Sequence, residues 1–331
     1  MDIELVDPAL RRLVSRVGSV DLSGEGVRRL ARLMSSLQVT PLARDVTITR
    51  VRSGPAKLRL YRPDRVAASA GLFWIHGGGY LFGRARQDDF LCLRVARELG
   101  IPVASAEYRM APEHPFPAGL EDVAAAWDWL VAEAQGAQGL QDNAVAAAPD
   151  AAARPGRPAV RLGIGGESAG GGLAAALVQR LHDAGGPQPQ AQWLFAPMLD
   201  DRTAADTSLD QADHWVWNNP SNRFAWRAYL GAEPGAADLP PYASPGRRQD
   251  LRGLPPTYIT MGDIELFYGE DLAYAERLRA AGVPVTIDVV PGAPHAIVHA
   301  DMLPLARDVV TRALAWLADA LGTRPAGTVA P

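Results

Sequence analysis

The sequence predicts an α/β domain in which a mainly parallel sheet is covered by helices on both faces. Short, dense apolar runs typical of central strands occur along most of the chain, and helical stretches separate most of them. A strand, a helix and a second strand form a parallel unit, because the helix returns the chain to the same end of the sheet. A Gly-x-Ser-x-Gly pentapeptide at Gly166–Gly170 lies between one such run and a helical stretch.

The first 40 residues are expected to be helical, because apolar residues recur at helical spacing in Leu10–Val17 and Val27–Leu37. Two alternating segments, Val46–Val51 and Leu58–Tyr61, then predict half-buried strands. The dense runs complete a set of eight strands: Leu72–Ile75, Pro102–Ala106, Val160–Ile164, Trp193–Ala196, Thr257–Met261 and Val285–Val290. The helices expected with them are Asp88–Leu99, Leu120–Ala134, Leu173–His182, Gly269–Ala281 and Leu303–Leu321.

Two regions interrupt this alternation. Residues 135–158 are rich in Ala, Gly, Gln and Pro without a period, which predicts a flexible surface insertion of about that length. Residues 202–245 contain several aromatic residues among polar residues and prolines. We expect this region and the N-terminal helices, about residues 1–42, to form a helical cap on a single domain that spans 1–331. The alternative, that these aromatic residues only close a core, stays open for any single tryptophan.

Composition excludes several classes of protein. Apolar residues make up 48% and charged residues 21% of the chain, as in soluble globular proteins, and a net charge of −4 gives no basic surface for nucleic acid or anionic lipid. Cys92 is the only cysteine, so neither an intramolecular disulfide nor a cysteine metal cluster can form. Met1–Glu4 is acidic with no apolar run after it, and no stretch is long enough to cross a bilayer. We therefore expect a cytoplasmic protein.

Ser168, the centre of the pentapeptide, is the candidate nucleophile. The apolar run Val160–Ile164 leads into the motif, and Leu173–Val178 follows it as a helix. A strand that turns sharply into a helix exposes the serine hydroxyl to a substrate and to a base. Glycines flank the serine because a side chain there would collide with the adjoining strand or helix.

His76–Tyr80 places three consecutive glycines directly after the strand Leu72–Ile75. Their backbone N–H groups can converge on an oxyanion. A phosphate-binding loop is the competing interpretation, but neither this segment nor Gly163–Gly166 completes Gly-x-Gly-x-x-Gly, and no Gly-Lys-Ser/Thr follows. We expect His76 to stabilise the loop by hydrogen bonding.

His295 is the candidate general base, because it follows the last predicted strand in a turn, after the serine in the chain. His299, one helical turn beyond it, is the rival candidate. The triad acid should lie between the serine and the histidine, after a strand, and both Asp263 and Glu265 follow Thr257–Met261. Both carboxyl groups would be ionised at neutral pH, so local patterns leave the choice open.

The motifs together resemble the hormone-sensitive-lipase-like esterases, bacterial family IV, of the α/β-hydrolase superfamily. His76–Tyr80 is similar to the family's His-Gly-Gly-Gly box, Gly166–Gly171 to its Gly-Asp/Glu-Ser-Ala-Gly-Gly box, and Glu107–Ala118 to its Asp-Tyr-Arg-Leu-Ala-Pro-Glu segment. The resemblance runs over nearly the whole chain. It implies the α/β-hydrolase fold, with a mostly parallel eight-stranded sheet and a helical cap.

The resemblance also assigns residues. It implies that the N–H groups of Gly78, Gly79 and Ala169 are the oxyanion donors. Aligned with the family's Asp-Pro-Leu tripeptide, Glu265-Leu266-Phe267 places Glu265 at the acid position, with Asp263 as the runner-up. The departures are Glu for Asp, and His295-Ala296-Ile297 for the family's His-Gly-Phe.

By the same resemblance, the cap would enclose a substrate pocket lined by Met34, Phe82, Trp215 and Trp217. The expected activity is hydrolysis of short- to medium-chain carboxylic esters through a Ser168–His295–Glu265 triad and an acyl-enzyme. No cofactor or metal is expected, the expected partner is a small-molecule ester rather than nucleic acid or a membrane, and a homodimer is left open. The alternatives are an amidase or lactonase using the same triad, or a non-catalytic ligand receptor on the same fold.

Overall fold

A computed structural model describes residues 1–18, 22–135 and 160–323. Its eight strands form one sheet in the order β1-β2-β4-β3-β5-β6-β7-β8. β1 and β2 are antiparallel to each other, β2 is antiparallel to β4, and all other pairs are parallel. The strands are β1 (Val46–Ser53), β2 (Ala56–Pro63), β3 (Ala70–Ile75), β4 (Val103–Ala106), β5 (Arg161–Glu167), β6 (Ala191–Phe195), β7 (Thr257–Gly262) and β8 (Val285–Val290). The predicted α/β fold with a mostly parallel eight-stranded sheet is confirmed.

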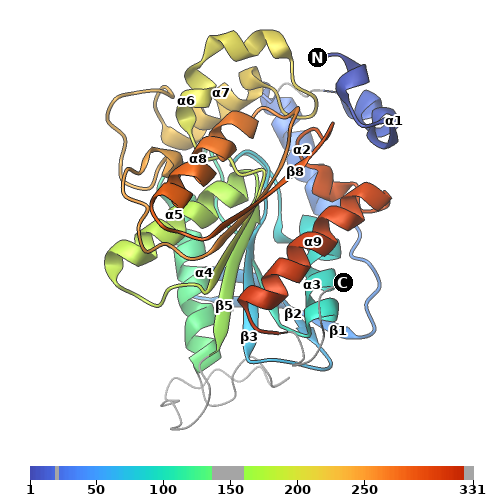
Figure 1. Ribbon diagram of the computed structural model, residues 1–331, viewed down its shortest axis with the longest axis vertical. Helices are drawn as coiled ribbons and strands as arrows, with labels where there is room; N and C mark the ends of the chain where they lie inside the picture. The colour runs from blue at the N-terminus through green and yellow to red at the C-terminus, as the bar shows by residue number, and fades with distance from the viewer. Residues whose placement is uncertain (19–21, 136–159, 324–331) are drawn as a thin grey trace.

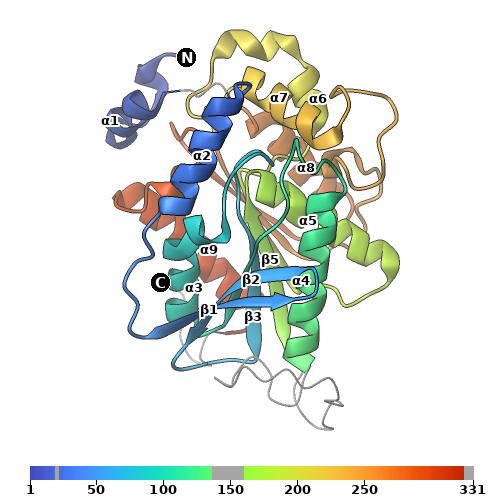
Figure 2. The same cartoon turned by 180° about the vertical axis from the view of Figure 1, so that it is seen from behind.

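Helices cover both faces of the sheet (Figures 1 and 2). One face is covered by α4 (Ala118–Gln135), α5 (Ala169–Ala184) and α8 (Tyr268–Ala280), and the other by α3 (Asp89–Leu99) and α9 (Pro304–Ala320). A hydrophobic core lies on each face of the sheet, and successive strand residues alternate between the two cores. In β3, Phe73 and Ile75 point into the core beneath α4, α5 and α8, and Leu72 and Trp74 into the core beneath α3 and α9. The predicted insertion at 135–158 lies outside the described residues, except that Gln135 ends α4.

Two strands differ from the sequence predictions in their burial. Val285–Val290, predicted as a central strand, is β8 at the edge of the sheet, and Val289 in it is 37% exposed. Its apolar pattern could not reveal this, because the order of strands in a sheet is set by long-range pairing. Leu58–Tyr61, predicted to be half-buried, is buried throughout in β2, because α3 and α4 both pack against that strand.

The burial of β2 places an ion pair in the core. Arg59 donates from Nε and Nη2 to the two carboxylate oxygens of Asp89 at 2.7 and 2.8 Å, and the hydroxyl of Tyr61 donates to the same carboxylate at 2.5 Å. The side chains of Arg59 and Asp89 are 11% and 3% exposed. Because these two charges are largely excluded from water, removing either side chain would leave the other as an unpaired buried charge.

Replacing Arg59 with methionine is therefore expected to lower the free energy of unfolding by about 3–5 kcal/mol, since Asp89 would be left as a buried charge without its cation. Urea unfolding measures this change. The matched control is Arg252→Met, which breaks an exposed ion pair with Asp250 and should leave the free energy of unfolding almost unchanged. Equal effects of the two substitutions would contradict this account of the β2 core.

Four further helices lie at the end of the molecule near the carboxyl ends of the parallel strands, with α1 set to one side of the others (Figures 1 and 2). They are α1 (Pro8–Val17), α2 (Glu25–Leu37), α6 (Asp201–Ala205) and α7 (Asn219–Leu230), and we call them the cap helices. Arg32 attaches α2 to the body, because its guanidinium pairs with Glu113 at 2.7 Å and donates to the carbonyls of Leu81 and Ala111, each at 2.8 Å.

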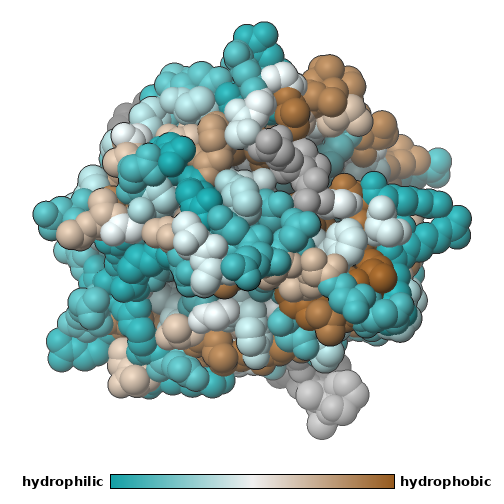
Figure 3. Space-filling model, turned by 90° about the horizontal axis from the view of Figure 1, so that it is seen from above, coloured by the Kyte–Doolittle hydropathy of each residue, from teal (hydrophilic) through white to brown (hydrophobic). Residues whose placement is uncertain are grey.

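The apolar residues of α2 are largely exposed. Leu30, Leu33 and Met34 are 57%, 52% and 57% exposed, so α2 directs much of its apolar face away from the two cores. Seen from above, apolar side chains gather toward one side of the molecule (Figure 3). Among the described residues, no helix is both long and apolar enough to cross a membrane.

Candidate active site

Ser168 lies at the corner between β5 and α5, as the pentapeptide predicts. Its φ and ψ angles of 54° and −122° place it in a region that side chains rarely adopt, and the residue is only 4% exposed. The flanking glycines are required by close packing: a Cβ on Gly166 would lie 2.4 Å from the carbonyl oxygen of Gly170, and one on Gly170 would lie 2.1 Å from that of Ile75. The corner therefore depends on both glycines.

The imidazole of His295 lies between the hydroxyl of Ser168 and the carboxylate of Glu265 and contacts both. Nε2 of His295 lies 2.9 Å from Oγ of Ser168, and Nδ1 of the same ring lies 2.5 Å from Oε2 of Glu265. Glu265 and His295 are 3% and 5% exposed, and the ring of Phe267 packs edge-on against the imidazole at 5.2 Å. An ionised Glu265 favours a proton on Nδ1, which leaves the Nε2 lone pair facing the hydroxyl.

Asp263, the runner-up acid, lies elsewhere. Its Oδ1 accepts a hydrogen bond from the backbone N–H of Gly292 at 2.7 Å, in the turn that precedes His295. It therefore supports the turn rather than the imidazole. Glu265, which the family alignment favoured, is the carboxylate that the structure brings to the ring.

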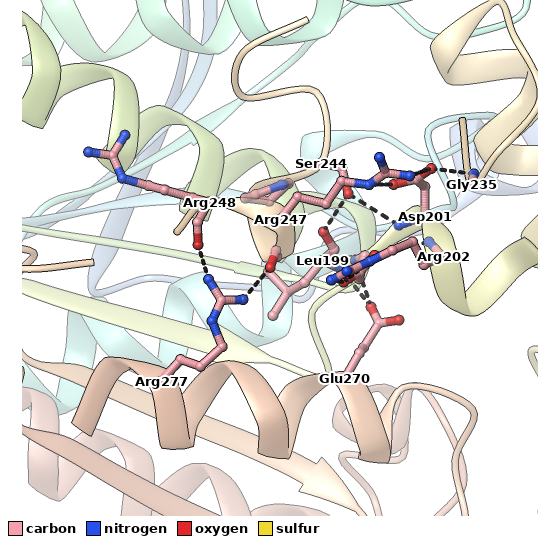
Figure 4. Close-up of polar contacts among 12 residues, drawn as sticks. Leu199, Asp201, Arg202, Gly235, Ser244, Arg247, Arg248, Glu270 and Arg277 are labelled. Carbon is pink, nitrogen blue, oxygen red and sulfur yellow. Dashed lines mark hydrogen bonds and ion pairs between the residues drawn. The ribbon is translucent and has the colours of Figure 1, made fainter. Parts of the chain in front are cut away.

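A polar network supports the segment that follows Glu265 (Figure 4). In α8, Oε1 of Glu270 accepts hydrogen bonds from the backbone N–H groups of Leu199 and Asp200, at 2.7 and 3.1 Å. Burial raises the pKa of Glu270 to about 8. Beside it, Asp201 and Arg247 form two hydrogen bonds of 2.7 Å. The hydrogen bonds of Glu270 join the loop after β6 to the start of α8, just after Glu265.

The glycine loop lies directly beside the serine. A Cβ on Gly77 would lie 3.3 Å from Cβ of Ser168, and the positive φ angles of Gly78 (116°) and Gly79 (58°) suit glycine. Among the described residues, no backbone carbonyl accepts a hydrogen bond from the N–H of either Gly78 or Gly79. Ala169 is the first residue of α5, so its N–H has no partner within the helix. All three predicted donors therefore have an N–H group available for an oxyanion.

His76 stabilises this loop in the manner expected from the sequence. Its Nδ1 lies 2.8 Å from the carbonyl oxygen of Gly77, and its ring stacks on Tyr108 with centroids 4.4 Å apart. The hydroxyl of Tyr108 donates to the carbonyl of His76 at 2.9 Å. Because burial lowers the pKa of His76, its ring is neutral at pH 7.

A cavity of about 460 Å³ opens onto Ser168 and His295. Three of the four residues predicted to line it do so, namely Met34, Phe82 and Trp217. The indole of Trp217 closes the cavity over the glycine loop, since a Cβ on Gly79 would lie 2.3 Å from that ring.

Trp215 is not among the residues that line this cavity; it packs, half-buried, against the core that contains α9. The reason is a tight turn between the two tryptophans. Val216 has a φ of 69°, and the N–H of Trp217 donates to the carbonyl of Trp215 at 2.8 Å, which is the geometry of a γ-turn. The turn separates side chains that the spacing alone would place on one face.

His299, the rival candidate for the base, contacts Glu167. Nε2 of His299 lies 2.7 Å from Oε2 of Glu167, the residue before the nucleophile, and 4.0 Å from Oδ1 of Asp88. From the sequence, Glu167 was noted only within the pentapeptide and the family's Gly-Asp/Glu-Ser-Ala-Gly-Gly box, and Asp88 only as the start of a predicted helix. Val17 at the end of α1 and Leu22 in the turn before α2 also line the cavity, and nothing in their local sequence indicated this.

Comparison with known proteins gives a consistent result. A family model described as the α/β hydrolase fold matches residues 72–299. The chain is 31% identical over 325 residues to a protein named Esterase LipI from Mycobacterium tuberculosis, a match that covers 94% of each chain. It is 30% identical to a protein named Carboxylesterase NlhH from the same species, with 96% of each chain covered. A solved structure titled Bacterial Heroin Esterase superposes with a TM-score of 0.82 at 31% identity, covering 96% of this chain and 99% of the other.

Proposed function

The chain belongs to the α/β-hydrolase superfamily, among its hormone-sensitive-lipase-like esterases, and from this premise we propose that it hydrolyses short- to medium-chain carboxylic esters through an acyl-enzyme. The observation that carries the proposal is the continuous line of contacts from Oγ of Ser168 through His295 to Glu265. A serine hydroxyl is a weak nucleophile until a base accepts its proton, and this geometry supplies the base.

The reaction begins when Oγ of Ser168 attacks the ester carbonyl while Nε2 of His295 accepts the hydroxyl proton. The N–H groups of Gly78, Gly79 and Ala169 stabilise the negative oxygen of the tetrahedral intermediate. His295 then donates its proton to the leaving alcohol, and the acyl group stays on Ser168. Water attacks this acyl-enzyme with the same base, the acid leaves, and the proton returns to the serine. Glu265 holds the tautomer and stabilises the imidazolium in both halves.

The cavity supports a preference for modest acyl groups. It is lined mainly by apolar side chains, among them Met34 and Phe82, and its volume lies in the range of small-molecule sites. We propose that the cap, about residues 1–42 and 202–245, encloses the substrate and limits its length.

p-Nitrophenyl esters of increasing acyl length test this preference. We expect kcat/KM to be highest near the butyrate ester and about tenfold lower or more for the laurate ester, because a long chain cannot be fully enclosed. Replacing Trp217 with alanine should shift the optimum toward longer chains. Equal kcat/KM for butyrate and laurate in the wild-type enzyme would contradict a length-limited pocket.

The triad separates this proposal from the non-catalytic receptor alternative. A receptor on the same fold would not need an imidazole 2.9 Å from the serine. The amidase or lactonase alternative uses the same triad, so assaying anilides and lactones beside the esters tests it. A cytoplasmic location and a homodimer remain predictions.

A further inference from the structure

Three side chains beside the nucleophile form a charged cluster that the mechanism above does not use. They are Asp88, Glu167 and His299, and one ligating atom from each lies within 4.8 Å of the others. Glu167 accepts a hydrogen bond from Nε2 of His299 at 2.7 Å. Oδ2 of Asp88 accepts from Nε1 of Trp74 at 2.7 Å, while its Oδ1 has no hydrogen-bond partner in the described part of the chain.

The two carboxylates of the cluster lie almost out of water, and the imidazole is partly exposed. Glu167 and Asp88 are 2% and 1% exposed, and the side chain of His299 is one-third exposed. Burial would lower the pKa of His299, but the Glu167 carboxylate, with a smaller effect of Asp88, raises it to about 9. Burial would likewise raise the pKa of Glu167, but the charge and hydrogen bond of His299 outweigh it and lower that pKa. At neutral pH, His299 is therefore an imidazolium paired with a carboxylate.

The carboxylate in this pair lies close to the reacting groups. Glu167 directly precedes Ser168, and a Cβ on Gly77 would lie 3.4 Å from its Oε2, so the carboxylate packs against the glycine loop. Both Glu167 and His299 line the cavity. An unpaired negative charge beside the forming oxyanion would raise the free energy of the transition state and slow the formation of the oxyanion.

The same contact joins two parts of the site. His299 ends the short helix η6 (Ile297–His299) that follows His295, whereas Glu167 ends β5 just before the nucleophile. A hydrogen bond between them links the segment that carries the base to the strand that carries the serine.

We propose that His299 is a positioning residue that neutralises the Glu167 carboxylate beside the forming oxyanion and holds the His295 segment against the end of β5. The proposal rests on the ester-hydrolase function proposed above. It assigns His299 an electrostatic role in the transition state and no contact with the reacting atoms.

A double-mutant cycle tests the electrostatic role. His299→Gln removes the positive charge and is expected to lower kcat on p-nitrophenyl butyrate by about tenfold or more, with KM within about twofold. Adding Glu167→Gln removes the unpaired negative charge, so the double variant should recover most of that loss. The matched control is His114→Gln, an exposed histidine outside the site, which should keep wild-type kcat. Wild-type kcat in His299→Gln, or a double variant that is no faster than His299→Gln, would overturn the proposal.

A measurement on the unmodified protein covers the case in which His299→Gln does not fold. The charged groups that act on His299 are Glu167 from β5, Asp88 beside α3, and Asp301 from its own loop. Nitrogen NMR of the imidazole rings should show the His299 ring doubly protonated at pH 7.5. A neutral His299 ring at that pH would contradict the proposal.

The results of these experiments distinguish a failure of the role proposed for His299 from a failure of the proposed ester-hydrolase function. If wild type turns over esters no faster than Ser168→Ala, the ester-hydrolase function fails, whatever the charge of His299. If wild type is active and the cycle shows no recovery, the role of His299 alone fails.

Discussion

Replacing Ser168 with alanine is expected to lower kcat for p-nitrophenyl butyrate by about 10⁵- to 10⁶-fold, because no other group can form the acyl-enzyme. The residual rate would come from substrate binding and the oxyanion donors. Folding should be preserved, since the change removes one oxygen atom and relieves no packing constraint. Steady-state kinetics with a urea unfolding curve measures both properties.

Ser105→Ala is the matched control for this substitution. Ser105 is a fully buried serine in β4, and its hydroxyl has no hydrogen-bond partner in the described part of the chain. The same chemical change at that position should leave kcat unaltered. A Ser168→Ala protein that is folded and retains more than about a hundredth of wild-type kcat would contradict the assignment of the nucleophile.

Glu265→Gln is expected to lower kcat by about 10⁴-fold with a smaller change in KM. Glutamine has the shape of glutamate but no charge, so it cannot stabilise the imidazolium. Its amide can also donate to Nδ1, which would favour the tautomer with the proton on Nε2, where His295 can no longer accept from Ser168. Comparing kcat and KM for the two proteins measures the loss.

Asp263→Asn is the control for the acid, because it changes a carboxyl group two residues away in the same loop. Asparagine retains an oxygen that can accept from the N–H of Gly292, so the turn before His295 should persist and kcat should fall by less than about tenfold. A larger loss of kcat in Asp263→Asn than in Glu265→Gln would transfer the role of triad acid to Asp263.

The sequence singled out Ser168 as the candidate nucleophile and His295 as the candidate base because each belongs to a local pattern. Ser168 needs only glycines, a preceding strand and a following helix, and His295 needs only a turn after the last strand. Their meeting follows from the parallel sheet, whose strands end at one edge. The acid could not be chosen from its surroundings, because Asp263 and Glu265 share the same loop and differ only in direction. The family alignment made that choice.

The features that the sequence did not predict depend on backbone geometry or on contacts between distant segments. β8 lies at the edge of the sheet because it pairs with β7 alone, which no property of residues 285–290 reveals. Trp215 and Trp217 separate because Val216 adopts a positive φ, which is rare for a β-branched residue and could not be expected from its type. The pairing of Glu167 with His299 joins residues far apart in the chain and has no local signal.

Trapping the covalent intermediate tests the central claim most directly. Wild type mixed with excess p-nitrophenyl butyrate and quenched in acid within milliseconds should carry one butyryl group, and peptide mass spectrometry should locate it on the hydroxyl of Ser168. The release of p-nitrophenol should show a burst of one equivalent per active site if deacylation is slower than acylation. A butyryl group on any other residue, or one that still forms in Ser168→Ala, would contradict the claim that this serine is the nucleophile.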